Sequence, residues 1–335
     1  MIDNPAVPAV MYSEEECSAH QSAEKLAMAV AVTSYIILFF AVISIKIVGL
    51  ELFGVLQLAY FNLADNEYVN LYLSPLLNWR FLNGFNLALE KGSPVPESIL
   101  AIDYGISFIS NINVMFLLLI CELILGLLLH FVGAKVAFLK KVSKFMLQEV
   151  FLTLFLFSSF NIAFSAGLHF KYATPASTQY YELSTLAAVL GVLTYLIILF
   201  CFQFAEKQDF GEFKQKFKKD CINQLYISFS VIYRMALGLY MATSIEDTFG
   251  TLIILAFSLT YIMYNIVNLP FADFYQNYRA NLCHVTQLIV LLATNYYRSM
   301  RFNDPLETRR THGLTKLELA MITIGVVVSA VCLAY

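Results

Sequence analysis

The stretch Val114–Val132, VMFLLLICELILGLLLHFV, decides how this chain can fold. It is almost wholly apolar, and as a helix it is long enough to cross the ~30 Å hydrocarbon core of a bilayer. One carboxylate, Glu122, lies near its middle, where an unpaired charge costs about 2.5 kcal/mol or more. The stretch therefore predicts a transmembrane helix that carries one acidic residue in need of a partner or a proton.

The composition extends this prediction to the whole chain. Of its 335 residues, 59% are hydrophobic and 13% are charged, whereas soluble domains contain about 25% charged residues. Apolar runs recur from residue 26 to residue 335, which indicates one polytopic membrane domain. The basic residues lie in short loops between these runs, so we expect no nucleic-acid partner.

We expect an all-α, polytopic transmembrane helical bundle of about eight spans. Residues 1–25 are acidic and are predicted to form a flexible tail ahead of the single membrane domain, 26–335. Residues 52–110 are rich in Tyr and Leu and form either an interfacial segment or an extramembrane cap. The expected spans cover approximately residues 27–48, 112–132, 147–168, 182–204, 222–242, 249–269, 281–297 and 317–335.

The lysine content of the loops predicts the orientation. The loops 133–145 and 205–220 each carry several lysines and share one face by parity, so we assign that face to the cytoplasm. The loop 298–316 is rich in arginine although parity places it outside. Either the last apolar run does not cross, or these arginines have an acidic or lipid partner.

A basic amphipathic helix is predicted over Asp209–Asp220, where Phe alternates with Lys. Its aromatic side chains would face lipid and its lysines would contact anionic headgroups. The plainer interpretation is a positive-inside marker and nothing more. The lysines concerned are Lys214, Lys216, Lys218 and Lys219.

Two opposite charges are predicted to lie at the same depth in the bilayer. Glu122 is thirteen residues from Lys135, and Arg234 is fifteen residues from Lys219. At 1.5 Å per residue these separations are about 20 Å and about 22 Å. Charges within lipid usually pair or line water, so we expect a Glu122–Arg234 ion pair. It would fix helix register or take part in permeation; alternatively the two residues make no contact.

Several other polar residues fall within or near the spans. His130 follows Glu122 by eight residues and could relay protons, although a hydrogen bond to a neighbouring helix is the commoner role. The others are expected to form interhelical hydrogen bonds, or a pore lining if several share one face. They include Asn161, Asn265, Asn268, His284 and Gln287.

Enzyme chemistry finds little support in the sequence. It contains no Gly-rich phosphate loop, nucleophile elbow or paired-carboxylate spacing. The six cysteines lack a metal-ligand or disulfide pattern. We therefore expect no catalytic residues, no metal and no cofactor.

Sequence blocks over Leu50–Tyr335 together resemble the TRP-like C-terminal membrane domain of large ciliate surface proteins with cysteine-rich repeats. The resemblance implies a cation pathway in a cell-surface or ciliary membrane, with an organelle membrane as the alternative. The blocks, in chain order, are GVLQLAYFNL (Gly54–Leu63), NINVMFLLL (Asn111–Leu119), VIYRMALGLY (Val231–Tyr240), TYIMYNIVNLPF (Thr260–Phe271) and RRTHGLTKLELAMI (Arg309–Ile322).

Two functions follow from these observations. The first is a TRP-like channel domain or membrane anchor with a possible cation pathway. The second is a non-catalytic structural or accessory subunit of a larger membrane complex. Both imply contact with membrane lipids, and with other membrane subunits or further copies of the chain.

Overall fold

The computed structural model describes residues 51, 54, 57, 104–133, 136–204, 225–243 and 248–303. The acidic tail, the spans expected at 27–48 and 317–335, most of the segment 52–110 and the lysines of 205–220 lie outside this part. The described elements are helical: α5 (Phe108–Val132), α6 (Ala137–Phe145), η3 (Met146–Phe151), α7 (Leu152–Phe157), α8 (Ser159–Tyr172), α9 (Tyr181–Phe204), α12 (Tyr226–Thr243), α13 (Thr248–Asn268) and α14 (Phe274–Asn303).

Three of these helices are long and apolar enough to cross a membrane: Phe108–Val132, Tyr181–Cys201 and Phe249–Asn268. Only 28% of the most apolar window of each is buried inside the protein. Because so much apolar surface would be unfavourable in water, these helices make the chain an integral membrane protein. The all-α class is confirmed for the described residues, whereas the count of eight spans stays a prediction.

The stretch expected as one span at 147–168 is not a single straight helix. A π-helical segment, Met146–Phe151, precedes α7, and the chain turns at Ser158 before α8. There the Ser158 hydroxyl donates to the carbonyl of Phe155 at 2.8 Å, and the Tyr195 hydroxyl donates to the same carbonyl at 2.9 Å. Side-chain donors that compete for backbone carbonyls bend helices, and periodicity alone did not indicate this bend.

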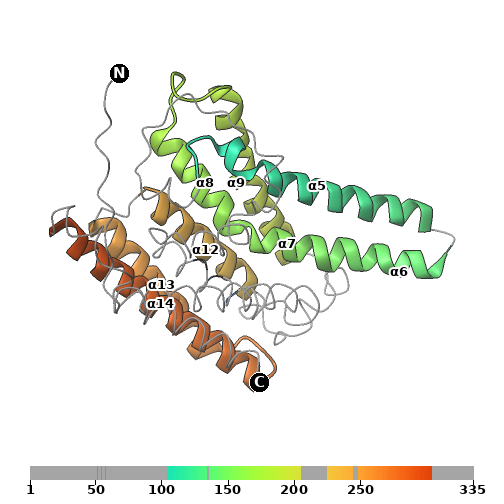
Figure 1. Ribbon diagram of the computed structural model, residues 1–335. Coiled ribbons are helices and arrows are strands. Elements are labelled where there is room, and N and C mark those ends of the chain that lie inside the picture. The colour runs from blue at the N-terminus through green and yellow to red at the C-terminus, as the bar shows by residue number, and fades with distance from the viewer. Residues whose placement is uncertain are drawn as a thin grey trace, which may run out of the picture.

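The centre of the described part of the molecule is the pair α8 and α12, which pack side by side (Figure 1). Every residue of α8 from Ser159 to His169 is buried. Gly238 of α12 permits this approach, because a Cβ there would lie 2.6 Å from the Phe160 carbonyl oxygen. The buried faces of these two helices are thus shielded from lipid, and they hold polar residues such as Asn161, Ser230 and Arg234.

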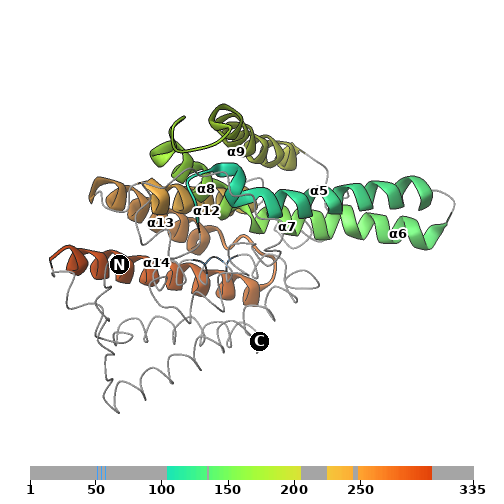
Figure 2. The ribbon, with the colours of Figure 1, turned by 45° about the horizontal axis from the view of Figure 1, so that its top comes forward.

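Helices α5 and α6 form an antiparallel arm that extends away from the central helices in both views (Figures 1 and 2). The arm is held together where Gly126 meets the Leu147 side chain and where the Ser143 hydroxyl donates to the Gly126 carbonyl at 2.9 Å. Much of its surface is apolar and exposed, which fits a lipid environment. Exposed side chains on the arm include Ile120, Leu123, Ile124, Leu125, Leu128, Phe131, Val132 and Phe138.

Near the start of two helices that are far apart in the sequence, an asparagine side chain makes the same pair of hydrogen bonds to a preceding backbone residue. The Asn111 side chain accepts from the backbone N–H of Gly105 at 2.9 Å and donates to its carbonyl at 2.8 Å. Asn277 makes the equivalent pair with Phe271, at 2.9 Å and 2.8 Å. In both cases the asparagine is the fourth residue of its helix, α5 or α14. Each fixes the incoming chain and satisfies buried backbone groups that would otherwise lack partners.

A buried charged network as candidate functional site

Three residues near the start of the chain project from one helical face into the core. Glu51, Gly54 and Gln57 are spaced by three residues, are helical and are fully buried. Because residues three apart share a face of a helix, this spacing directs one carboxylate and one amide toward the same neighbours. Gly54 lies between them and is in close contact with both α12 and α14. A Cβ there would lie 2.9 Å from Gln287 Nε2 and 3.4 Å from Arg234 Nη1.

The Glu51 carboxylate is surrounded by hydrogen-bond donors from α12 and α13. Its Oε1 accepts from the hydroxyl of Ser230, from that of Tyr226 at 3.2 Å, and from that of Tyr261 at 3.4 Å. These donors replace part of the hydration that a carboxylate loses when it is buried. Ser230 follows Tyr226 by four residues, so one face of α12 supplies two of the three hydroxyl groups.

Helix α14 closes the other side of Glu51. Its His284 Nδ1 lies 3.5 Å from Glu51 Oε2, and its Nε2 lies 3.1 Å from the Tyr226 hydroxyl. Gln287, one helical turn further along α14, donates from Nε2 to the backbone carbonyl of Glu51 at 2.8 Å. The carboxylate therefore lies where the N-terminal segment and helices α12, α13 and α14 converge.

Arg234 connects this cluster to the central helices. Its Nη2 donates to Gln57 Oε1 at 2.7 Å and to the Phe157 carbonyl at 3.4 Å. Gln57 in turn donates to Asn161 Oδ1 at 2.6 Å, and Asn161 donates to the Tyr104 hydroxyl at 2.9 Å. The result is a hydrogen-bonded chain from Arg234 to Tyr104.

The network carries one fixed positive charge and one carboxylate in the interior. Arg234 has 1% of its surface exposed and Glu51 has 0%. Ions this deeply buried are retained only when opposite charges and hydrogen bonds offset their lost hydration. Because the partners come from five segments of the chain, the network fixes their relative positions as well as their charge.

The structure does not bring Glu122 and Arg234 together. Glu122 lies on the α5 arm, and its Oε1 has no hydrogen-bond partner among the described residues. Matching two residues by depth compares their levels in the bilayer and contains no information on their lateral positions. The acid near Arg234 is instead Glu51, which falls between the span predicted at 27–48 and the segment 52–110 and was not among the predicted site residues. Its one sequence signal is the spacing Glu51–Gly54–Gln57 next to apolar residues.

The other predicted polar residues have different surroundings. Asn161 and His284 belong to the network, which confirms hydrogen bonds between helices at these positions. Asn265 is buried, and its side chain lies beside the Tyr261 hydroxyl on the same helix. His130 is exposed at the end of α5 beside Phe131. Lys214, Lys216, Lys218 and Lys219 lie outside the described residues.

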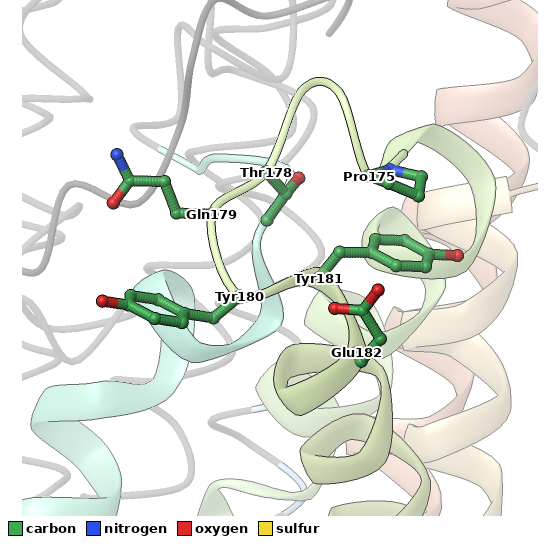
Figure 3. Close-up of a pocket in the computed structure, with 6 residues that line it drawn as sticks. All are labelled: Pro175, Thr178, Gln179, Tyr180, Tyr181 and Glu182. Atoms are coloured by element: carbon green, nitrogen blue, oxygen red, sulfur yellow. The ribbon is translucent and has the colours of Figure 1, made fainter.

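A second polar site is a surface hollow of about 430 Å³ ahead of α9. One loop and the first helical turn line it, with Pro175, Thr178, Gln179, Tyr180, Tyr181 and Glu182, and Figure 3 shows Tyr180 and Tyr181 directed to opposite sides. Tyr180 has a φ of 53°, a conformation that costs a non-glycine residue about 1–2 kcal/mol. The hollow lacks the converging charges of the buried network, so the network is the stronger candidate site.

No family model matches the chain, and no curated protein or solved structure is similar to it, so the fold and the network themselves carry the functional argument.

Proposed function

We propose that this integral membrane protein is a TRP-like channel domain in which the Glu51–Arg234 network controls a cation pathway. The observation that carries the proposal is the placement of both charges in the interior of a membrane protein. Ionisable residues inside membrane bundles usually mark ion or proton pathways. The resemblance of the sequence blocks to TRP-like membrane domains supports the same interpretation.

The arrangement of the network favours a role in opening and closing the cation pathway over a role as residues that line the pore. Its groups bond to one another and hold the segment of Glu51 and Gln57 against α12 and α14. Any movement of that segment relative to α12 would separate donors from acceptors in the interior. Such a rearrangement requires a discrete second set of partners, which is the property of a two-state gate.

The proposed topology has eight spans with the lysine-rich loops in the cytoplasm. Membrane lipids would contact the α5–α6 arm, and further subunits or copies of the chain would complete the assembly. The proposed location is the cell surface or the ciliary membrane, with an organelle membrane as the alternative. In this topology α8 and α12 form the interior of the bundle and the three most apolar helices form its periphery.

Reconstitution of the purified chain into liposomes and planar bilayers tests the proposal. We expect a cation conductance that Glu51→Gln reduces by about tenfold or more, because the variant loses the carboxylate charge but keeps its shape. Glu182→Gln is the matched control, since Glu182 is exposed in the surface hollow. Equal conductance of the two variants would refute control by the network.

The second candidate is an accessory subunit, and the α5–α6 arm favours it. The arm extends from the central helices and exposes apolar side chains over much of its length (Figure 2). Such a surface could pack against another membrane protein as well as against lipid. Absence of conductance together with stoichiometric co-purification of another membrane protein would favour this function over the channel.

A further inference from the structure

We propose that Glu51, His284 and Tyr226 form a proton-binding site whose occupied and empty states differ in the direction of the Tyr226 hydroxyl. The proposal goes beyond cation conduction and does not require it, because proton binding is measured on the imidazole itself. It rests on the geometry of three side chains from three different segments of the chain.

A histidine nitrogen and a carboxylate oxygen lie next to each other across the site. His284 Nδ1 and Glu51 Oε2 are 3.5 Å apart, and the Gln287 side chain on α14 is a second polar neighbour of the imidazole. Both residues are fully buried, with 1% and 0% of their side-chain surface exposed. An unprotonated nitrogen beside a carboxylate oxygen is repulsive in a buried site, which favours a hydrogen on one of the two atoms.

The Tyr226 hydroxyl bridges the other two atoms of the same pair. Its oxygen is 3.1 Å from His284 Nε2 and 3.2 Å from Glu51 Oε1. A hydroxyl has a single hydrogen, so Tyr226 can donate to only one neighbour at a time: the imidazole, the carboxylate or the Tyr261 hydroxyl. That choice depends on whether Nε2 already carries a proton.

In the empty state Tyr226 donates to Nε2, and the single hydrogen of the neutral imidazole is on Nδ1 and points toward Glu51 Oε2. Glu51 Oε1 still accepts from Ser230 and Tyr261. In the occupied state one proton from water is on Nε2, which now donates to the Tyr226 oxygen. The Tyr226 hydrogen turns to Glu51 Oε1, and the Nδ1 hydrogen stays in place. Uptake adds one proton and changes no bond between heavy atoms.

The surrounding groups make this exchange possible in the interior. Glu51 supplies the negative charge and Arg234 on α12 the positive charge, so the empty site is close to neutral. The other titratable groups near the site, among the described residues, include Tyr233 on α12, Tyr261 on α13 and Cys283 on α14. In their protonated forms they are uncharged and supply no competing base. The occupied site carries one additional positive charge, so a cation that entered the network would compete with the proton.

Nitrogen NMR of the full-length chain in detergent, with labelled histidine, tests the proposal. The chain has five histidines, and His284→Gln identifies the signal that belongs to His284. We expect that signal to change from neutral imidazole to imidazolium as the pH falls from about pH 8 to about pH 4, while the amide spectrum stays native. A His284 signal that does not titrate in a folded protein over this range overturns the proposal.

The role of the hydroxyl is tested by Tyr226→Phe, with Tyr233→Phe as the matched control. Both tyrosines are buried on α12, but the Tyr233 hydroxyl bonds to Ser258 at 2.9 Å. Tyr226→Phe removes the acceptor of the added proton, so we expect about tenfold weaker proton binding, a titration one pH unit lower. If both variants titrate like the native chain, the hydroxyl is not part of the site. Should Tyr226→Phe fail to fold, the native chain decides: the neutral His284 imidazole must carry its hydrogen on Nδ1, and a neutral form protonated on Nε2 contradicts the proposal.

Discussion

Replacement of Gly238 by alanine would test whether α8 and α12 are in backbone contact. The added Cβ would lie 2.6 Å from the Phe160 carbonyl oxygen, 3.0 Å from the Phe164 nitrogen and 3.3 Å from the Ala163 Cβ. Ordinary contact begins at 3.4 Å, so the closest approach is short by about 0.8 Å. Two of the three atoms belong to the backbone of α8 and cannot rotate away.

The expected cost follows from this geometry. Overpacking of a well-packed core costs about 1–3 kcal/mol, and a contact with backbone atoms favours the upper end of that range. Alanine would recover about 1 kcal/mol of intrinsic helix preference relative to glycine. We therefore expect Gly238→Ala to lower the free energy of unfolding by about 2 kcal/mol. The measurement is equilibrium unfolding of the purified chain in mixed micelles, followed by circular dichroism.

Gly191→Ala is the matched control for this experiment. Its Cβ would meet only the ring of Phe108, at 3.0 Å and 3.5 Å, and a ring can shift by a few tenths of an ångström. We expect this variant to be as stable as the native chain or more stable by up to about 1 kcal/mol. Equal stability of the two variants would refute the argument that α8 and α12 touch through their backbones.

The remaining predictions concern polar groups. Arg234→Leu should lower the free energy of unfolding by about 3–5 kcal/mol, because it leaves the buried Glu51 carboxylate without its positive partner. Glu122→Leu should leave the free energy of unfolding nearly unchanged. Equal losses in the two variants would instead support the Glu122–Arg234 ion pair. Asn277→Asp should cost about 1–3 kcal/mol, since it keeps the acceptor for the Phe271 N–H but loses the donor to its carbonyl; a native unfolding midpoint would contradict this. Burial lowers the pKa of His169, against the raising effect of its bond to a backbone carbonyl, so the unfolded chain binds more protons and stability should fall as the pH drops below about 6.5. The unfolding midpoint of His169→Gln should fall less over the same range.

The sequence determined the membrane environment and four of the helices. The predicted ranges 112–132, 182–204, 222–242 and 249–269 correspond to α5, α9, α12 and α13, with bounds within four residues. In α5, α9 and α13 most apolar side chains face outward, so lipid selects their composition directly. A local property of each stretch was enough to find these helices.

The interior was decided only by the tertiary structure. Glu51 lies close to the end of an apolar run and Arg234 lies within another, and no local pattern relates them. Their approach depends on Gly54, which leaves room for the Arg234 and Gln287 side chains, and on Gly238, which lets the backbones of α8 and α12 come together. It also depends on the bend at Ser158, where two hydroxyl groups donate to the Phe155 carbonyl. A buried charge is stabilised by partners from distant segments, and those partners are known only once the helices have packed.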